Sequence, residues 1–320
     1  MNSSTHKSPF LQAINVEYDN KSNYLKRSIG SLQKQTLKEI EIVAVNDYSE
    51  DSSLKILNEM IKKDSRIKIV NNHKNRGLLF SRAMGILYSK GEYLMNLDPD
   101  DALENSESLR YLYRKIKNSK PDVIKFGMLF KNNLKKERIF KCKSFNKIIY
   151  QPQIFNDGCI LEDFFITNKL IKKNILIKAF ESFKQNIYGE KWNYAEDEIW
   201  GALVNKNANS LICVNKIIYT YFINSDSLIT NKYNIIYLKN LLYWLKMFTK
   251  IFDIREYEKY LMNRILLILE LIKEDNYKNI FKKEIELKKN YIKVLQNINM
   301  KRFNNYNDVL NNIIEYLKFL

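Results

Sequence analysis

Cysteine and histidine are scarce in this chain. The 320 residues include three cysteines and two histidines, at Cys142, Cys159, Cys213, His6 and His73. The cysteines are odd in number and too widely spaced for a zinc knuckle, and two histidines add few further ligands. The composition therefore argues against a metal centre built from cysteine and histidine. It also indicates a protein kept in a reducing, cytoplasmic compartment.

Long apolar runs are missing as well. Residues 1–18 contain no apolar stretch of signal-peptide length. The most apolar window, residues 260–274, is interrupted by Asn263, Arg264 and Glu270. No segment therefore reaches the roughly 18 uninterrupted apolar residues that a membrane span needs. Because 45% of the residues are hydrophobic, we expect a folded, soluble protein, or at most one that binds to a membrane surface.

Acidic residues are outnumbered by basic ones, which gives a net charge of +17. Such an excess is typical of proteins that bind nucleic acid or an anionic membrane. Most of it lies in two segments, with +7 in residues 120–150 and +6 in residues 235–320. The rest of the chain carries only +4, so the first hundred residues are not a nucleic-acid-binding surface. We expect no nucleic-acid partner.

Helical and strand-like patterns alternate along the first two-thirds of the chain. Apolar residues recur with helical spacing in the segments 24–35, 52–63, 78–89, 104–119 and 196–208. Short apolar runs rich in β-branched residues occupy the segments 40–46, 66–72, 92–97, 122–130, 138–142 and 211–223. This alternation is typical of βαβ units, and it predicts an α/β fold with a mostly parallel sheet flanked by helices.

The last third of the chain has a different pattern. From about residue 233, Leu, Ile and Tyr recur every three or four residues, and neither Pro nor Gly occurs after Gly201. We predict one globular domain over residues 1–232 and an all-helical C-terminal region over residues 233–320. The apolar faces of that region either pack against the protein itself or, with Trp244 and a basic surface, dock on an anionic membrane.

Acidic side chains crowd at the ends of two predicted strands. Asp98, Asp100 and Asp101 follow the apolar run at 92–97, and Asp47 follows the run at 40–46. Like charges so close repel one another unless a cation or hydrogen-bond donors neutralise them. Two interpretations are open: an ordinary surface turn, or a metal or phosphate site in the crevice at the carboxyl ends of a parallel sheet.

Three blocks of sequence carry a family resemblance. They are residues 35–57 (QTLKEIEIVAVNDYSEDSSLKIL), 75–103 (NRGLLFSRAMGILYSKGEYLMNLDPDDAL) and 195–208 (AEDEIWGALVNKNA). In this order they resemble the successive signatures of family 2 glycosyltransferases of the GT-A fold. The resemblance implies transfer of a sugar from a nucleotide-sugar donor to a glycan, lipid-linked or protein acceptor. We expect the donor to be UDP-linked. It also implies a nucleotide-binding part over about 12–104 and an acceptor-binding, catalytic part over about 105–232.

By this resemblance Asp100 is a ligand of Mg²⁺ or Mn²⁺, and Asp98 binds the ribose. A hard cation of this kind takes carboxylate oxygens and neutralises the charge that builds up on the departing diphosphate. Asp101 stays open between membership of this cluster and an N-cap of the helix predicted to follow it.

The same resemblance assigns five further residues to the nucleotide. Asp47 accepts the imide proton of the base, and Asn20 lies in the turn after the first strand. Asn75, Gly77 and Arg82 come from the second block, with Gly77 at a helix start that suits an anion. For Arg82 the plain alternative is a solvent-facing position on an amphipathic helix.

The third block supplies the general base. An acceptor hydroxyl has a very high pKa and must lose its proton as it attacks the anomeric carbon. By resemblance Asp197 takes this proton in an inverting displacement, and Glu196 holds the acceptor or orients the loop. The plain alternative is an acidic first helical turn that complements the helix dipole, and the two interpretations are compatible.

The chain departs from the family pattern at several positions. Glu17 stands where proline is expected, Tyr48 where glycine is usual, and Asn224 where relatives often carry a basic residue or histidine. Two alternatives therefore remain: a relative that has lost activity, and a nucleotidyltransferase that uses the same sheet. Against the second, residues 14–23 lack the Gly-rich, Lys- or Arg-containing loop typical of nucleotidyltransferases.

Overall fold

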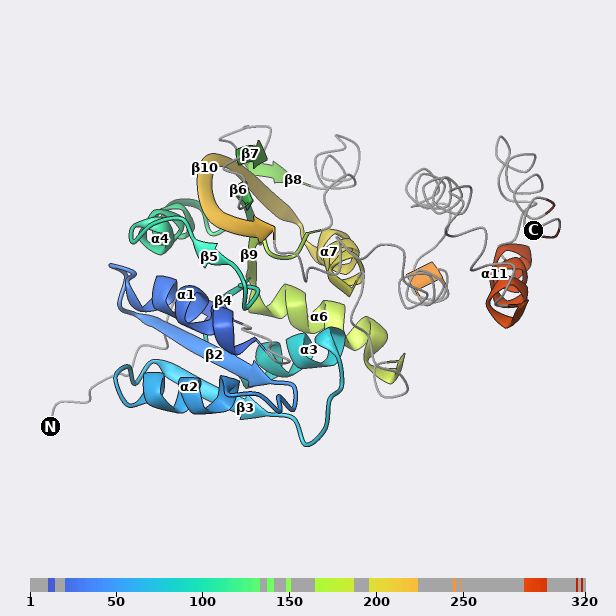
Figure 1. Ribbon diagram of the computed structural model, residues 1–320. Helices are drawn as coiled ribbons and strands as arrows, with labels where there is room; N and C mark the ends of the chain where they lie inside the picture. The colour runs from blue at the N-terminus through green and yellow to red at the C-terminus, as the bar shows by residue number, and fades with distance from the viewer. Residues whose placement is uncertain are drawn as a thin grey trace, which may run out of the picture. The chain divides into compact units, whose positions relative to one another are not determined.

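The computed structural model describes residues 11–14, 21–132, 137–140, 148–150, 165–186 and 196–223, and in the C-terminal third residues 244, 245, 248, 285–297, 315 and 318. The chain divides into two compact units, residues 1–225 and residues 226–320. Figure 1 shows the helices and strands of the first unit.

A mixed sheet forms the framework of the first unit (Figure 1). In the described part of the chain its strand order is β3-β2-β1-β4-β9-β6-β10-β5, with β7 paired to β6 and β8 paired to β10. The strands are β1 Leu11–Ile14, β2 Ile40–Asn46, β3 Ile67–Asn71, β4 Tyr93–Asn96, β5 Ala102–Leu103, β6 Val123–Asn132, β7 Glu137–Phe140, β8 Ile148–Tyr150, β9 Lys169–Lys172 and β10 Ser210–Ile223. The pairs formed by β1 to β4 are parallel, as is the pair of β6 and β10, whereas β9 runs antiparallel between β4 and β6. The predicted α/β class is confirmed, and the antiparallel pairs formed by β5, β7, β8 and β9 make the sheet a mixed one.

Six α-helices accompany this sheet in the described part of the first unit. They are α1 Ser22–Gln33, α2 Ser53–Ile61, α3 Leu78–Tyr88, α4 Ser108–Ser119, α6 Lys173–Phe183 and α7 Glu196–Asn207, and a short 3₁₀ helix, η1 Lys184–Asn186, follows α6. One buried apolar cluster joins α1, α2 and α4 to the sheet, with Leu25, Leu57 and Leu112 among its members. Helices α3, α6 and α7 contact one another, and the rings of Phe183 and Trp200 meet edge to face with centroids 4.8 Å apart.

The central strands form because their residues suit a sheet covered on both faces. All seven residues of β2 are buried, and its sequence IEIVAVN is an almost continuous β-branched and apolar run. Such runs are typical of parallel strands with helices on both sides. The burial of β3 is less complete, in keeping with its place at the edge of the sheet. The carboxyl ends of β2 and β4 therefore emerge from a rigid core.

Two segments differ from the sequence prediction. The helix expected over 104–119 begins at Ser108, because Ala102 and Leu103 form β5 and pair with Tyr219 and Thr220 of β10. The elements β9 and α6 were not singled out by periodicity. The fully buried Lys169 opens β9 and interrupts the apolar pattern that would reveal a buried strand.

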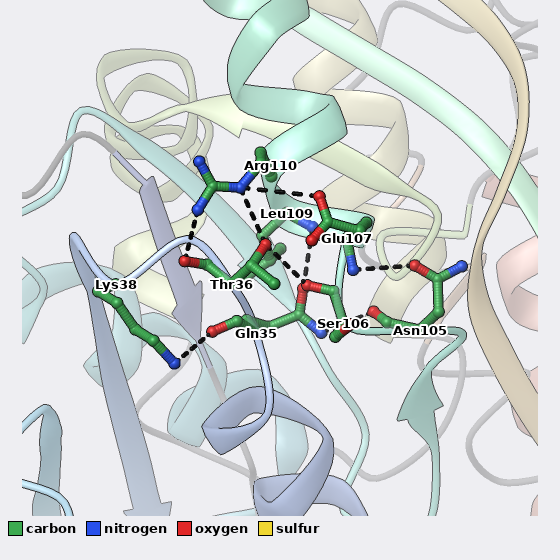
Figure 2. Close-up of polar contacts among 8 residues, drawn as sticks. All are labelled: Gln35, Thr36, Lys38, Asn105, Ser106, Glu107, Leu109 and Arg110. Carbon is green, nitrogen blue, oxygen red and sulfur yellow. Dashed lines mark hydrogen bonds and ion pairs between the residues drawn. The ribbon is translucent and has the colours of Figure 1, made fainter.

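A polar network ties the end of α1 to the start of α4 (Figure 2). The buried side chain of Gln35 donates from Nε2 to the carbonyl oxygen of Asn105 at 2.8 Å and accepts from the amide of Leu109 at 3.0 Å. Arg110 donates from Nη2 to the carbonyl oxygen of Thr36 at 2.7 Å. Gln35 thus gives the amide of Leu109 a hydrogen-bond partner. That amide lies in the first turn of α4, where no carbonyl of the helix can accept from it. These contacts also fix the chain just beyond the acidic turn.

In the second unit, α11 spans Ile285–Asn297, and the rings of Trp244 and Phe248 stack with centroids 4.8 Å apart. Most of the predicted helical region, residues 233–320, lies outside the described residues. Among the described residues, no helix is both long and apolar enough to cross a membrane.

Candidate active site

The candidate site lies where β2 and β4 end, beside α3 and α7. Asn46 is the last residue of β2 and Asn96 the last of β4, and both side chains are buried. Crevices at the carboxyl ends of parallel strands are the usual ligand sites of such sheets. The acidic turn 97–101 follows β4 directly.

Arg82 of α3 joins the two parts of this site. Its side chain is 3% exposed, and its Nη2 lies 3.4 Å from Oδ1 of Asp98, while Nη1 lies 3.3 Å from Oε1 of Glu196. Asp98 follows β4, whereas Glu196 is the first residue of α7. The solvent-facing alternative for Arg82 is therefore wrong. Its guanidinium lies inside the protein, between two carboxylates.

Both carboxyl groups beside Arg82 have raised pKa values. Burial raises the pKa of Glu196 to about 7; the Arg82 charge opposes the rise, and the Asp197 charge adds to it. Burial also raises the pKa of Asp98, again against Arg82 and with a contribution from Asp100. Because 33% of the Asp98 side chain is exposed, solvent moderates the effect of burial there. Perturbed carboxylates gathered around one cation are typical of functional sites.

Asp197 lies in the first turn of α7, between Glu196 and Glu198. Its Oδ1 accepts a hydrogen bond from the amide of Glu198 at 3.0 Å, and the three carboxylates complement the positive end of the helix dipole. Its negative charge also raises the pKa values of Asp98 and Glu196. Asp197 thus belongs both to a helix start and to a cluster of carboxyl groups with Asp98 and Glu196.

Asp100 faces the start of α1. Nζ of Lys21 lies 3.8 Å from its Oδ2, and Arg27 donates from Nη2 to its main-chain oxygen. The guanidinium of Arg27 in turn lies 3.8 Å from the centre of the Phe222 ring, at the end of β10. Sequence reasoning missed both cations, because α1 shows only the ordinary pattern of an amphipathic helix.

No group of three or more His, Cys, Asp or Glu side chains suited to a metal ion occurs among the described residues. Magnesium sites often need fewer: one or two carboxylates bind the ion, and water and substrate phosphates complete its shell. The partly exposed carboxylate of Asp100 fits a site of that kind. The neighbouring Asp101 does not.

Asp101 is fully buried and holds the acidic turn to β10. Its Oδ2 accepts from the hydroxyl of Tyr219 at 2.6 Å, and its Oδ1 accepts from the amide of Phe222 at 2.9 Å. The amide of Asp98 donates to the same Tyr219 oxygen at 3.1 Å. The N-cap interpretation of Asp101 is wrong, because β5 follows it and its carboxylate points to β10. Asp101 instead fixes the turn that carries Asp98 and Asp100.

Asp47 is buried against the loop that leads into α3. Its Oδ1 accepts from Nδ2 of Asn72 and from the amide of Arg76, each at 2.8 Å, and its Oδ2 accepts from the amide of Gly77 at 2.7 Å. Gly77 has a φ of 85°, a conformation that a side chain would strain. Asp47 therefore shapes the loop 72–77, and its predicted hydrogen bond to the base stays a prediction.

The turn after β2 has a tyrosine in a position that suits glycine. Tyr48 adopts a φ of 65°, and its side chain is 51% exposed. The turn is held by Asn46, whose Oδ1 accepts from the amide of Ser49 at 2.9 Å. Asp51 accepts from the amide of Ser22 at 3.0 Å and so joins this turn to the start of α1. The backbone thus keeps a glycine-like geometry although the family's usual glycine is absent.

Of the two remaining residues predicted to contact the nucleotide, Asn75 lies among the described residues and Asn20 does not. Asn75 lies in the loop before α3 and is partly buried, next to Arg76, whose guanidinium lies 4.9 Å from the ring centre of Phe80. Asn20 lies outside the described residues, as does Asn224.

The amino-acid sequence of this chain is similar to those of several glycosyltransferases. Glycosyltransferase GlyA of Streptococcus pneumoniae is 30% identical over 214 residues, which are 65% of this chain and 30% of that protein. The uncharacterized glycosyltransferase EpsJ of Bacillus subtilis is 24% identical over 222 residues, 68% of this chain and 62% of EpsJ. The cholesterol galactosyltransferase of Borreliella burgdorferi is 28% identical over 206 residues, 64% of this chain and 50% of that protein. The chain thus spans less than two-thirds of the length of each.

Solved structures show the same fold. Residues 1–349 of Staphylococcus aureus TarS in complex with UDP-GlcNAc give a TM-score of 0.69 at 18% identity, covering 97% of this chain and 87% of that one. The complex of the same TarS fragment with UDP gives a TM-score of 0.66 at 16% identity, with the same coverage. At this identity the likeness shows the fold alone, which is GT-A.

The family model described as glycosyl transferase family 2 matches residues 17–180, more than half of the chain. That match covers the acidic turn, Asp47, Arg82, and the strands and helix that carry them. The chain therefore belongs to glycosyl transferase family 2, and its fold is GT-A.

Proposed function

We propose that this protein moves a sugar from a nucleotide-sugar donor to a hydroxyl group of an acceptor, with inversion at the anomeric carbon. The observation that supports this best is the pairing of Arg82 with both Asp98 and Glu196. Asp98 belongs to the segment assigned to the donor, and Glu196 to the segment assigned to the acceptor. A transfer between two bound substrates requires that these segments meet in one crevice.

In the proposed reaction the acceptor oxygen forms a bond to the anomeric carbon while the bond from that carbon to the β-phosphate oxygen breaks. The nucleoside diphosphate leaves with the bonding electrons, and the proton of the acceptor hydroxyl passes to the carboxylate of Asp197. Glu196 is engaged by Arg82, so it positions the site, and the partly exposed Asp197 beside it is our choice for the base.

For the donor we propose a UDP-linked sugar. The TarS structures with which this chain shares its fold were solved with UDP-GlcNAc and with UDP. Asp98 would bind the ribose hydroxyls, and the loop shaped by Asp47, with Asn75 and Gly77, would face the base. Asn20 completes the proposed nucleotide contacts.

We further propose a divalent cation, Mg²⁺ or Mn²⁺, at Asp100. When bound, such a cation neutralises the negative charge that develops on the departing diphosphate. Asp100 offers one carboxylate, so most of the cation's ligands would be water and diphosphate oxygens. We therefore expect cation and donor to bind together, each much more weakly without the other.

The proposed acceptor is a glycan or a lipid-linked molecule. One relative is a cholesterol galactosyltransferase, which by its name acts on a lipid, although that protein is twice as long as the matched region. The net charge of +6 in residues 235–320 would suit contact of the second unit with an anionic membrane surface.

Binding of sugar nucleotides tests the proposed function. Thermal unfolding is measured with UDP-, GDP- and CDP-linked sugars and with nucleoside triphosphates, each with and without Mn²⁺, because a ligand that binds the native state raises the midpoint. We expect UDP-linked sugars to raise it, and Mn²⁺ to enlarge the effect. No stabilisation by any sugar nucleotide would favour an inactive relative, and a preference for nucleoside triphosphates would favour the nucleotidyltransferase.

A further inference from the structure

We propose that Lys21 is a donor-binding residue that exchanges between two anionic partners. Without donor, its ammonium group pairs with the carboxylate of Asp100. With donor, the divalent cation takes Asp100 and the ammonium group of Lys21 binds the diphosphate. This inference rests on the proposed transferase function and assigns a new residue to it.

The backbone of Lys21 is fixed while its side chain is held only weakly. Its amide donates to Oγ of Ser53 at 3.2 Å, and the next amide, that of Ser22, donates to Oδ2 of Asp51 at 3.0 Å. Its Nζ lies 3.8 Å from Oδ2 of Asp100, a long distance for an ion pair, and the two side chains are 28% and 22% exposed. Partly exposed ion pairs of this kind contribute only about 0–1 kcal/mol to the stability of the folded state. The ammonium group can therefore change partner at small cost.

The charges of the acidic turn create a need for such a cation. A diphosphate bound there would meet the partly exposed carboxylates of Asp98 and Asp100. The guanidinium of Arg82 is buried and already pairs with Asp98 and Glu196. Lys21 combines a positive charge, a long flexible stem and partial exposure next to the acidic turn. It is therefore well placed to bind a phosphate oxygen.

Arg27 keeps Asp100 in place during this exchange. It donates from Nη2 to the main-chain oxygen of Asp100, and its guanidinium lies 3.8 Å from the ring centre of Phe222 and 5.4 Å from that of Tyr24. The turn is thus anchored through its backbone, and the Asp100 carboxylate does not depend on Lys21 for its position. Lys21 therefore offers a positive charge at the start of α1, beside an anchored turn.

The test compares Lys21→Met, which keeps the stem without the charge, with Lys21→Arg and with Lys26→Met, a matched control at an exposed position of the same helix. Calorimetry measures the affinity for UDP and for uridine in the presence of Mn²⁺. We expect Lys21→Met to bind UDP about tenfold more weakly, which corresponds to about 1.4 kcal/mol, and uridine as the wild type does. Lys21→Arg should retain most of the UDP affinity, and Lys26→Met all of it.

A second measurement addresses the exchange itself. Electron paramagnetic resonance follows binding of Mn²⁺ alone, and we expect Lys21→Met to bind it several-fold more tightly, because the ammonium group of Lys21 no longer competes for Asp100. Unchanged or weaker Mn²⁺ binding would overturn the exchange. Unchanged UDP affinity, or equal losses for UDP and uridine, would overturn the contact with the diphosphate. A wild-type protein that does not bind UDP would instead overturn the proposed donor, and the wild-type titration reports that separately.

Discussion

Nη1 of Arg82 lies 3.3 Å from Oε1 of Glu196, so a residue of the proposed nucleotide-binding segment is paired with the first residue of the helix that carries the proposed base. The same guanidinium lies 3.4 Å from Oδ1 of Asp98. Buried charges are costly without a partner, and each of these carboxylates therefore depends on Arg82 for its ionised form. The two segments are coupled both in position and in charge.

Replacement of Arg82 should damage the fold as well as the site. Arg82→Met removes the buried cation that pairs with both Asp98 and Glu196, and we expect the free energy of unfolding to fall by about 3 kcal/mol. Arg82→Lys keeps the charge but not the planar guanidinium group that reaches both acids. Its free energy of unfolding should therefore lie between those of the wild type and Arg82→Met. Urea unfolding measures both. A stable Arg82→Met protein that has lost only donor binding would show that the guanidinium serves the nucleotide directly.

The proposed base gives a different signature. Asp197→Asn should leave the affinity for the donor nearly unchanged and lower turnover by about two to four orders of magnitude, the usual scale for loss of a general base. Calorimetry and single-turnover kinetics separate the two effects. Glu198→Gln, in the same helical turn, is the control and should keep most of the activity. A fall in donor affinity without a fall in turnover per bound donor would make Asp197 a binding residue.

Asp100→Asn tests the cation. The amide keeps the size of the side chain, and the turn stays anchored by Arg27, so we expect an unchanged unfolding midpoint. Binding of UDP should lose its dependence on Mn²⁺, because a carboxylate oxygen is replaced by a weaker ligand. Titrations of UDP with Mn²⁺ and with excess chelator measure this. Full activity of the wild type in excess chelator would argue against a cation at Asp100.

The pH dependence of stability reports on Glu196. Folding raises its pKa from about 4.5 to about 7, so the native state binds more protons than the unfolded state in this interval. Stability therefore falls as the pH rises from about 4.5 to about 7 and levels off above it. Glu196→Gln removes this contribution, and urea midpoints at pH 5 and pH 8 should differ less in the variant than in the wild type. Parallel midpoints would contradict the raised pKa.

The network of Gln35 predicts a purely structural effect (Figure 2). Gln35→Leu leaves the amide of Leu109 and the carbonyl of Asn105 without their side-chain partner, and we expect a loss of about 1–3 kcal/mol. Lys38→Met is the control, since Lys38 is exposed and contacts only the main-chain oxygen of Gln35 in this network. Chemical denaturation measures both. Equal stability of the two variants would show that water replaces the lost contacts.

The sequence predicts the elements whose pattern is local and uninterrupted. The strand at 40–46 and the helix after Gly77 are of this kind, and both are found nearly where they were expected. Strand β9 is not, because the buried Lys169 lies opposite the buried Lys125 of β6, and a local pattern with a lysine in it resembles a surface. The environment that makes these lysines tolerable is formed by other parts of the chain.

The candidate site shows the same limit. Asp100 and Asp101 are neighbours in an identical local context, yet one is partly exposed beside Lys21 and the other is fully buried. What separates them is Tyr219, which lies far along the chain and becomes a neighbour only through the pairing of β5 with β10. Residue types and spacing therefore predict a cluster of carboxylates at the ends of the strands. They do not predict which of these carboxylates holds the backbone of the turn in place.

The three hydrogen bonds that Asp47 accepts from the loop 72–77 have a consequence for how a ligand would arrive. A loop that is held by a buried carboxylate has its conformational entropy removed during folding, so binding would not have to order it again. Gly77 fixes the same conformation from the backbone side. A nucleotide would meet a receptor that is already shaped, and its association rate would be governed by diffusion and by the field of the surrounding charges, with no slow step in which the loop closes.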